Sequence, residues 1–237
     1  MRLVIGSLFL TFLYLTSCLS QTYIVAVTPF EVIGASQRAD VLSHGIPQAI
    51  ANDLSHMPDI QMVERLQLSS VLQELKLQQA GLVNTQNAAS VGELLGANLV
   101  IVGSVQDMQG TIQIHTRAVQ TATGEVLFGV EDQRPLKTMN DYFSLEDQIT
   151  KGILTQLGFR IAESELEAIE KKATDSDDAF QAYSSALKHF DSGEPDSGLV
   201  EIQKAQQQDP AFDWAGDIRA RAQQAFEELD REIKNAK

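Results

Sequence analysis

The chain has 237 residues, of which 43% are hydrophobic and 21% charged, the composition of a globular protein with a buried core. Its 32 acidic residues against 18 Lys and Arg give a formal net charge of −14. We therefore expect no nucleic acid partner, because binding DNA or RNA needs basic clusters. The single Cys excludes an internal disulfide bond, so packing must stabilise the fold.

Residues 1–20 have the pattern of a signal peptide. Arg2 precedes an apolar run over residues 3–14, which is too short to span a bilayer. The run leads into LTSC at residues 15–18, which resembles the lipobox of bacterial lipoproteins. This resemblance implies that Cys18 receives a lipid and becomes the new N-terminus.

The residue after Cys18 indicates which of the two membranes would hold the lipid anchor. Leu19 stands where an Asp is associated with retention in the inner membrane, so the outer membrane is favoured. Two alternatives stay open. Cleavage before Gln21 would discard Cys18, and an uncleaved segment would remain as an anchor.

Apolar periodicity predicts an α/β domain over residues 21–160. Apolar runs and period-two alternation indicate strands, whereas apolar positions three and four residues apart indicate helices. Gly110 marks a turn that would join two of the strands into a hairpin. Strands are expected at residues 23–30, 60–65, 98–107, 111–120 and 125–131, and helices at 41–57, 66–79, 86–95 and 144–157. The order β-α-β-α-α-β-β-β-α predicts a mixed sheet packed by helices.

The rest of the chain is expected to be helical. Residues 161–178 are rich in Glu, Lys, Asp and Ala, which favours a helical linker. Small residues and a proline then follow at the spacing of a helical repeat, at Ala186, Gly198, Ala205 and Pro210. Residues 179–237 therefore resemble a small all-α domain of tetratricopeptide type, although Ala182 replaces a Trp and His189 an aromatic residue. A helix over residues 212–235 would cover this repeat.

The sequence shows no pattern of catalytic, metal-binding or phosphate-binding residues. His44, His56, His115 and His189 are isolated and lack the spacing of metal ligands. The acidic stretch at 175–178 lacks the glycine and glutamate of a calcium loop. We expect this stretch to cap a helix instead.

Glu64 and Arg65 lie at the end of a predicted strand, where they could hold a ligand, but we favour an ion pair or strand-end solvation. We therefore expect no catalytic, cofactor-binding or metal-binding residue, and one modified residue, the lipidated Cys18. The protein is expected not to be an enzyme.

Several segments, taken in order, resemble one family. They are VERLQLSSVLQEL at 63–75, LGANLVIVGS at 95–104, RAV at 117–119 and TGEVL at 123–127. Over residues 22–157 the chain is similar to the CsgG family, bacterial outer-membrane lipoproteins named for the curli secretion channel. The resemblance implies an α/β core that is also shared with FlgO-like flagellar lipoproteins and LpoB-like activators of cell-wall synthases. The core alone therefore does not fix the function.

One departure from that family concerns its pore. The resemblance implies two membrane-spanning β-hairpins per subunit, each strand with about 9–11 residues of alternating character. At the first hairpin position this chain has only residues 108–110. At the second, residues 128–143 carry several charges and no evident alternation. We therefore expect a relative that lacks the pore hairpins.

These observations predict a non-enzymatic periplasmic lipoprotein, anchored in the outer membrane, that binds other cell-envelope proteins. It would serve the assembly or regulation of a secretion or surface structure, and the helical repeat would provide a second contact surface. Two alternatives stay open. The protein could be an oligomeric component of a curli-like export apparatus, in which case it would form a homo-oligomer, or it could be a periplasmic carrier of a small ligand.

Overall fold

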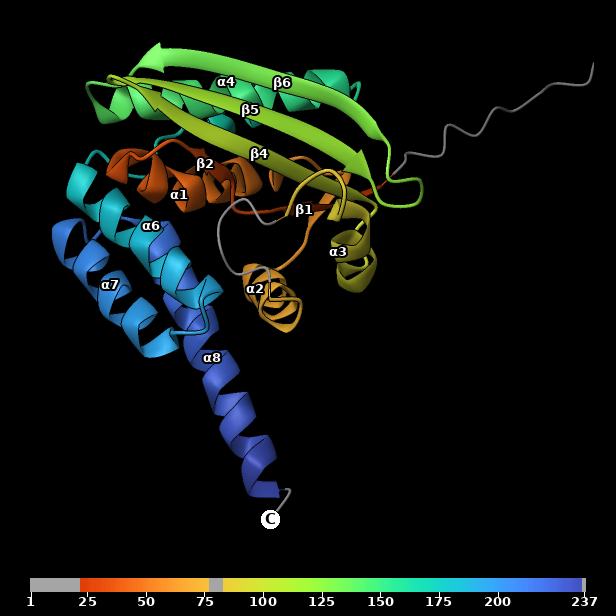
Figure 1. Ribbon diagram of the computed structural model, residues 1–237. Coiled ribbons are helices and arrows are strands. Elements are labelled where there is room, and N and C mark those ends of the chain that lie inside the picture. Colours follow the sequence, from red (N-terminus) through yellow and green to blue (C-terminus); the bar gives the residue numbers. More distant parts are fainter. Residues whose placement is uncertain (1–21, 77–82, 236–237) are drawn as a thin grey trace, which may run out of the picture.

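The computed structural model describes residues 22–76 and 83–235, whose arrangement is shown in Figure 1. The strands are β1 (Tyr23–Val27), β2 (Glu31–Ile33), β3 (Ile60–Met62), β4 (Leu99–Met108), β5 (Thr111–Gln120) and β6 (Val126–Pro135). The helices are α1 (Gln37–Leu54), α2 (Arg65–Glu74), α3 (Ala88–Leu95), α4 (Met139–Gln156), α5 (Glu163–Ile169), α6 (Asp177–Asp191), α7 (Pro195–Gln208) and α8 (Asp213–Asn235). Within these ranges, no helix combines the length and apolar character that a membrane crossing requires.

The six strands form one mixed sheet. Five of them follow the order β3-β1-β4-β5-β6, and β2 also pairs with β4. The pairs made by β1 and β2 are parallel, whereas β4, β5 and β6 are antiparallel to one another. The turn between β4 and β5 has φ values of 57° at Gln109 and 93° at Gly110, the left-handed pair that a tight hairpin favours. The predicted fold class and hairpin are confirmed.

The short strand β2 was not predicted. It continues the line of β1 along β4, because Val27 is opposite Ile101 and Glu31 is opposite Ser104. The β1–β2 segment therefore accommodates one extra residue between these two pairings. Pro29 lies in this interval, where it cannot donate to the hydrogen-bond ladder and so divides the strand in two.

Helices cover both faces of the sheet. α1 and α4 pack on one face, and α2 and α3 pack on part of the other (Figure 1). The first face contributes Val25, Val27, Leu99, Ile101, Val105, Ile112 and Ile114 to its core, and the second contributes Ala26, Val100, Val102 and Val119. Successive strand residues thus enter opposite cores, which explains the continuous apolar runs in β1 and β4.

A proline in α1 helps to fix this helix on the sheet. Pro47 has no N–H to donate to the carbonyl of Ser43, four residues earlier. The backbone N–H of Phe30 donates to that carbonyl instead, at 2.8 Å. Phe30 is completely buried between β1 and β2. The helix therefore gains a backbone hydrogen bond to the β1–β2 connection where its own ladder is interrupted.

Strand β6 is longer than predicted and reaches Pro135. Exposed and half-buried residues alternate along most of this strand. Arg134, at a half-buried position, pairs with Asp132 at 2.8 Å and donates a hydrogen bond to the hydroxyl of Ser144 on α4 at 2.7 Å. This alternation is one of exposure, and the expectation that residues 128–143 lack the apolar alternation of a membrane-spanning strand stays a prediction. The charged side chains of Asp132 and Arg134 occupy inward positions of β6, where each has a polar partner. Apolar and polar residues therefore do not alternate along this strand.

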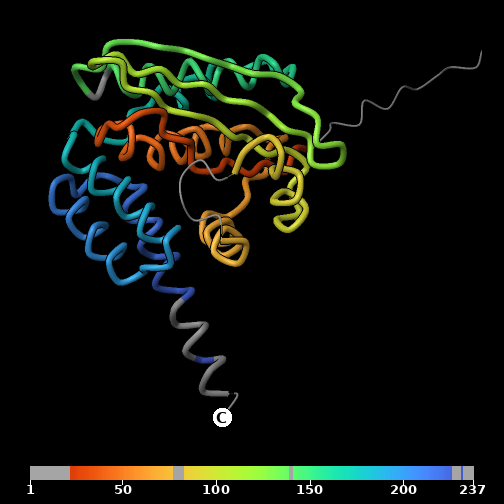
Figure 2. Tube along the Cα trace, in the orientation of Figure 1, coloured from red at the N-terminus to blue at the C-terminus, as the bar shows by residue number. Residues whose placement is uncertain are grey.

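The C-terminal helices α6, α7 and α8 pack beside α1, as the chain trace in Figure 2 shows. One continuous hydrophobic cluster includes Ile46 and Ile50 of α1 together with Phe180 and Tyr183 of α6. The small residues expected between α6 and α7 are buried, namely Ala186, Gly198 and Ala205. The helix predicted over 212–235 is confirmed as α8, whereas the tetratricopeptide type and the domain boundaries stay predictions.

Parts of two predictions lie outside the described residues. They are residues 77–79 of the helix predicted at 66–79, and several side chains of α8, among them Phe226, Leu229 and Ile233.

Candidate functional site at the junction of α1, α2 and α6

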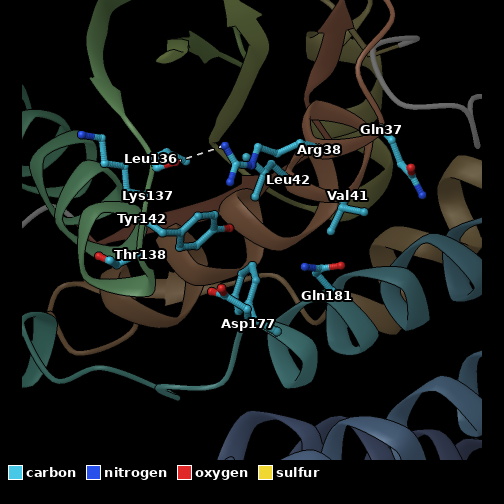
Figure 3. A pocket seen from close by; sticks show the side chains of 11 residues that line it. Gln37, Arg38, Val41, Leu42, Leu136, Lys137, Thr138, Tyr142, Asp177 and Gln181 are labelled. Carbon is cyan, nitrogen blue, oxygen red and sulfur yellow. Dashed lines mark hydrogen bonds between the residues drawn. The ribbon is translucent and has the colours of Figure 1, made fainter. Parts of the chain in front are cut away.

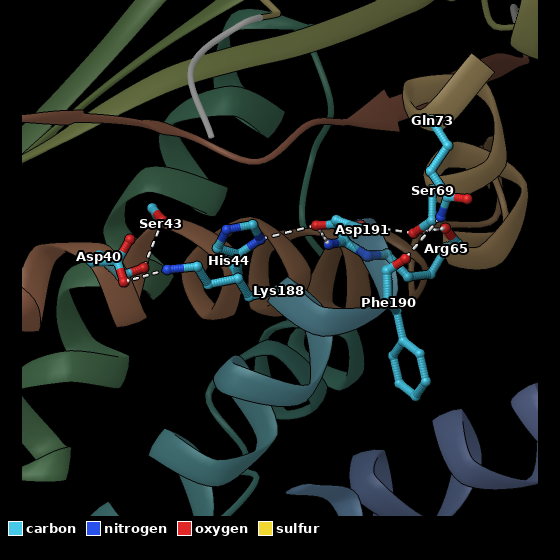
Figure 4. A network of polar contacts seen from close by, with 9 residues as sticks. All are labelled: Asp40, Ser43, His44, Arg65, Ser69, Gln73, Lys188, Phe190 and Asp191. Atoms are coloured by element: carbon cyan, nitrogen blue, oxygen red, sulfur yellow. Dashed lines mark hydrogen bonds and ion pairs between the residues drawn. The ribbon is translucent and has the colours of Figure 1, made fainter. Parts of the chain in front are cut away.

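Three helices meet at the carboxylate of Asp191, which ends α6 and is fully buried (Figure 4). Its Oδ2 accepts a hydrogen bond from Nη2 of Arg65 on α2 and lies 2.9 Å from Nδ1 of His44 on α1. Its Oδ1 accepts a hydrogen bond from the hydroxyl of Ser69 on α2, at 2.7 Å. These four residues, the Asp191 network, join helices that are far apart in the sequence.

The network keeps a charge in the protein interior. Burial on its own would raise the pKa of Asp191, but the Arg65 charge and the hydrogen bonds from His44 and Ser69 outweigh it. The net effect holds the pKa of Asp191 below its usual range. Because donors already occupy the carboxylate, it is poorly suited to act as a base or nucleophile. Its role is to hold α6 against α1 and α2.

Gly45 allows α6 to approach α1 closely. A Cβ atom at this position would lie 2.7 Å from the ring of Phe180 and nearer still to the hydroxyl of Ser184. Both of these residues are on α6. Gly45 directly follows His44, so the close approach and the Asp191 network position the same pair of helices.

A cleft with a volume of about 320 Å³ lies beside the Asp191 network, between α1, β3 and α2 on one side and α6 and α8 on the other. We call it the junction cleft. Arg65 and Tyr183 are buried in its walls, Trp214 is half-buried, and the exposed Arg221 pairs with Glu64 at its rim. Trp, Tyr and Arg are the residue types most enriched at the energetic centres of protein interfaces. The junction cleft is therefore a candidate contact site for a partner protein.

A second buried polar group lies between α1 and α4. The side chains of Asp53 and Glu146 hydrogen-bond to each other, and carboxylate oxygens of Asp53, Glu146 and the half-buried Asp147 lie within 4.8 Å of one another. Burial is the main reason that the pKa of Asp53 rises to about 8 and that of Glu146 well above its usual range. Oxygen ligands of this kind suit a hard cation, but at neutral pH a proton holds the pair together.

The structure places the sequence-predicted site residues in different ways. Cys18 lies outside the described residues. His44 belongs to the Asp191 network, while the half-buried His115 and His189 lie 2.8 Å and 2.7 Å from the carboxylates of Glu131 and Glu194. His56 is exposed.

Two favoured interpretations are confirmed. Glu64 and Arg65 form ion pairs, although with different partners: Arg221 for Glu64 and Asp191 for Arg65. The acidic stretch at 175–178 caps α6, because the hydroxyl of Ser176 accepts a hydrogen bond from the N–H of Ala179 at 3.1 Å.

Sequence analysis missed Asp191. Its partners are 122 to 147 positions away in the chain, so no local spacing connects them. An aspartate at the end of an amphipathic helix is normally a surface residue. Only the tertiary fold reveals that this one is internal.

Comparison with known proteins gives a match in the N-terminal part of the chain. The family model described as the curli production assembly/transport component CsgG matches residues 20–109. This segment is thus similar to that family. The resemblance predicted for residues 22–157 is confirmed up to residue 109.

Among curated proteins, the chain is similar to a putative adenylate cyclase 3 of Rhizobium meliloti (strain 1021). The two are 25% identical over 156 residues, which cover 66% of this chain and 24% of the relative. The matched region thus spans about a quarter of the length of that relative.

Among solved structures, the chain is similar to the LpoB C-terminal domain from Salmonella enterica, with a TM-score of 0.40, 17% identity, and coverage of 51% of this chain and 87% of that one. The lipoprotein GNA1162 from Neisseria meningitidis has a TM-score of 0.40 and 14% identity, with 59% and 99% covered. A PelC dodecamer from Paraburkholderia phytofirmans has a TM-score of 0.39 and 13% identity, with 60% and 90% covered.

Proposed function

We propose that the protein is a CsgG-like periplasmic lipoprotein, held at the outer membrane through Cys18, that binds other envelope proteins. Its binding would serve the assembly or regulation of a secretion or surface structure. The observation that carries this proposal is the match of residues 20–109 to a curli assembly and transport component. The lipobox-like LTSC at residues 15–18 supports the same location.

The junction cleft supports a binding role. Arg65, Tyr183, Trp214 and Arg221 line it, and two parts of the chain contribute its walls. A partner seated there would contact both the α/β part and the C-terminal helices, which we take to be a tetratricopeptide-like domain over residues 179–237. Rigid placement of α6 by the Asp191 network would present such a partner with a preformed surface, which lowers the entropic cost of binding.

The proposed role is non-enzymatic. The ionised Asp191 already binds three donors, and Asp53 and Glu146 bind each other, so these side chains are already engaged within the protein. The cyclase name belongs to a relative of which the matched region covers only 24%. We therefore do not extend cyclase activity to this chain.

The proposal is tested by chemical cross-linking in intact cells, followed by identification of the trapped proteins. We expect envelope proteins to be trapped by the wild-type chain and lost in an Arg221→Glu variant, which reverses an exposed charge at the cleft rim. Arg117→Glu, an equal change on an exposed part of β5, should retain them. Cross-links only to further copies of this chain, or equal losses in both variants, would contradict binding at the junction cleft.

A further inference from the structure

A separate cavity lies at the opposite end of α6 from Asp191. It has a volume of about 290 Å³ and lies between α1, the β6–α4 connection and the first turn of α6 (Figure 3). Because α6 has 15 residues, about 20 Å of helix separates this cavity from the Asp191 network. We call it the α6 N-terminal cavity.

The inner part of the α6 N-terminal cavity is apolar. Leu42, Leu136, Phe180 and Tyr142 line it and are all buried. The Tyr142 ring makes an edge contact with the Phe180 ring, with centroids 4.6 Å apart. This contact fixes the direction of the phenol, whose hydroxyl points into the space between α1 and α6 in Figure 3.

The Tyr142 hydroxyl is buried and has no hydrogen-bond partner among the residues that the structure describes. A buried hydroxyl without a partner is costly, and most buried polar groups in proteins are satisfied. Burial also raises the pKa of Tyr142 well above its usual range, so the group remains a neutral donor. A bound molecule with an acceptor oxygen would satisfy it.

Charged residues surround the entrance to the cavity. Arg38 is exposed there, and its Nη1 donates to the carbonyl of Leu136 at 3.1 Å, which holds the guanidinium at the entrance. Lys137 is also exposed and lines the cavity from the β6–α4 connection, and Asp177 lies on the α6 side (Figure 3). Asp107 lies near Arg38 and Asp141 near Lys137, so the entrance carries no excess of positive charge. A guanidinium has five N–H donors, however, so Arg38 can donate to one ligand carboxylate as well as to Leu136. A dianion would meet the Asp177 carboxylate as well.

We infer that the α6 N-terminal cavity binds an apolar side chain that carries one carboxylate, as in the C-terminal residue of a peptide or a free N-acylated amino acid. The apolar body would contact Leu42, Leu136 and Phe180, an oxygen would accept from Tyr142, and the carboxylate would lie near Arg38 and Lys137. The volume is at the lower end of that of ligand pockets, which favours one aromatic or branched side chain. This inference does not depend on the location or partners proposed above.

Calorimetric titration of the full chain tests this with two probes that differ by one charge. N-acetyl-L-phenylalanine should bind with a dissociation constant of about 1 mM or lower, the range for a ligand of this size. N-acetyl-L-phenylalaninamide, which lacks the carboxylate, should bind at least about tenfold more weakly, a loss typical of a missing charge-assisted hydrogen bond. Inorganic phosphate should give no binding heat. Equal binding of acid and amide, or no binding of either, would overturn the inference.

Three variants locate the binding. Lys137→Gln should weaken binding of the acid and leave the amide unchanged, whereas Lys171→Gln, the same change at an exposed site away from the cavity, should alter neither. Tyr142→Phe should weaken binding without lowering the melting temperature of the empty protein, because the hydroxyl that it removes has no partner. Equal effects of Lys137→Gln and Lys171→Gln would contradict binding in this cavity.

A second pair of probes separates the two sources of such a carboxylate. A hexapeptide that ends in Phe with a free carboxyl group should bind at least as tightly as N-acetyl-L-phenylalanine if the natural ligand is a protein C-terminus. If the peptide fails to bind while the small acid binds, the ligand is a free metabolite. In either case the C-terminal amide of the peptide should bind at least about tenfold more weakly than N-acetyl-L-phenylalanine, and binding as tight as that of the acid would overturn the role of the carboxylate.

Discussion

Arg65 on α2 and Asp191 on α6 form a buried ion pair, although 126 positions separate them in the chain. His44 and Ser69 complete the hydrogen bonding of the carboxylate. Because an unpaired charge in the interior is strongly unfavourable, both residues are stable only when α6 is seated against α1 and α2. The position of the C-terminal helices therefore depends on one carboxylate.

Replacement of Asp191 should strongly destabilise the protein. Asp191→Asn preserves the size of the side chain but leaves the buried Arg65 without a counter-charge, and breaking a buried pair in this way costs about 3–5 kcal/mol. We expect this loss in the free energy of unfolding, measured with urea at pH 7. Asp178→Asn, an exposed position on the same helix, should cost less than about 1 kcal/mol. Similar losses in the two variants would exclude a special role for Asp191.

The close approach at Gly45 leads to a second prediction. Gly45→Ala adds a methyl group against Phe180 and Ser184, and overpacking of this kind costs about 1–3 kcal/mol. Gly216→Ala on α8 is the matched control, because its new Cβ would meet only the Gln206 side chain, at 3.6 Å. The control should be neutral or more stable by up to about 1 kcal/mol, since Ala favours helix. Urea unfolding should separate the two variants, and a stable Gly45→Ala protein would disprove the contact.

The buried pair of Asp53 and Glu146 makes stability depend on pH. In the unfolded chain Asp53 loses its proton near 3.8, whereas in the folded protein it retains it up to about pH 8. Between these values the folded state binds more protons, so the free energy of unfolding falls as pH rises, by up to about 1.4 kcal/mol per pH unit for one group. The protein should therefore be more stable at pH 5 than at pH 8. Asp191 acts in the opposite sense, since its lowered pKa removes stability only below 3.8.

Asp53→Asn isolates this effect. Burial is the main reason that the pKa of Glu146 is raised, and the charge of Asp53 adds to it; the uncharged amide removes this second cause and can donate to Glu146. The variant should therefore lose less stability between pH 5 and pH 8 than the wild type and should be the more stable of the two at pH 8. Asp175→Asn, at an exposed position, should follow the wild type. An unchanged pH dependence in Asp53→Asn would show that this pair is not its source.

The sequence was sufficient for the main elements of the fold, because their residues repeat at regular intervals. Apolar alternation located β5, and apolar positions three and four residues apart located α1 and α4. The three residues of β2 are too few to give such a signal, and Pro29 separates them from β1. Local patterns therefore revealed long elements and missed a short one.

The candidate site was less accessible from sequence. Asp191 and Glu146 lie on helices whose other charged side chains reach solvent at least in part, so nothing local distinguishes a buried acid from a solvated one. The junction cleft also combines α1, α2 and α8, whose relative placement no spacing encodes. By contrast, the helix cap at Ser176 was predictable, because capping depends on neighbours within one turn.

Attachment to the envelope through Cys18 is the central claim, because the proposed partners are envelope proteins. The most direct measurement is incorporation of radiolabelled palmitate into the wild-type protein and a Cys18→Ser variant, followed by separation of membrane and soluble fractions. We expect label in the wild-type protein alone, together with its recovery in the outer membrane. Failure of the label to enter the wild-type protein, or equal labelling of both proteins, would contradict lipid attachment at Cys18.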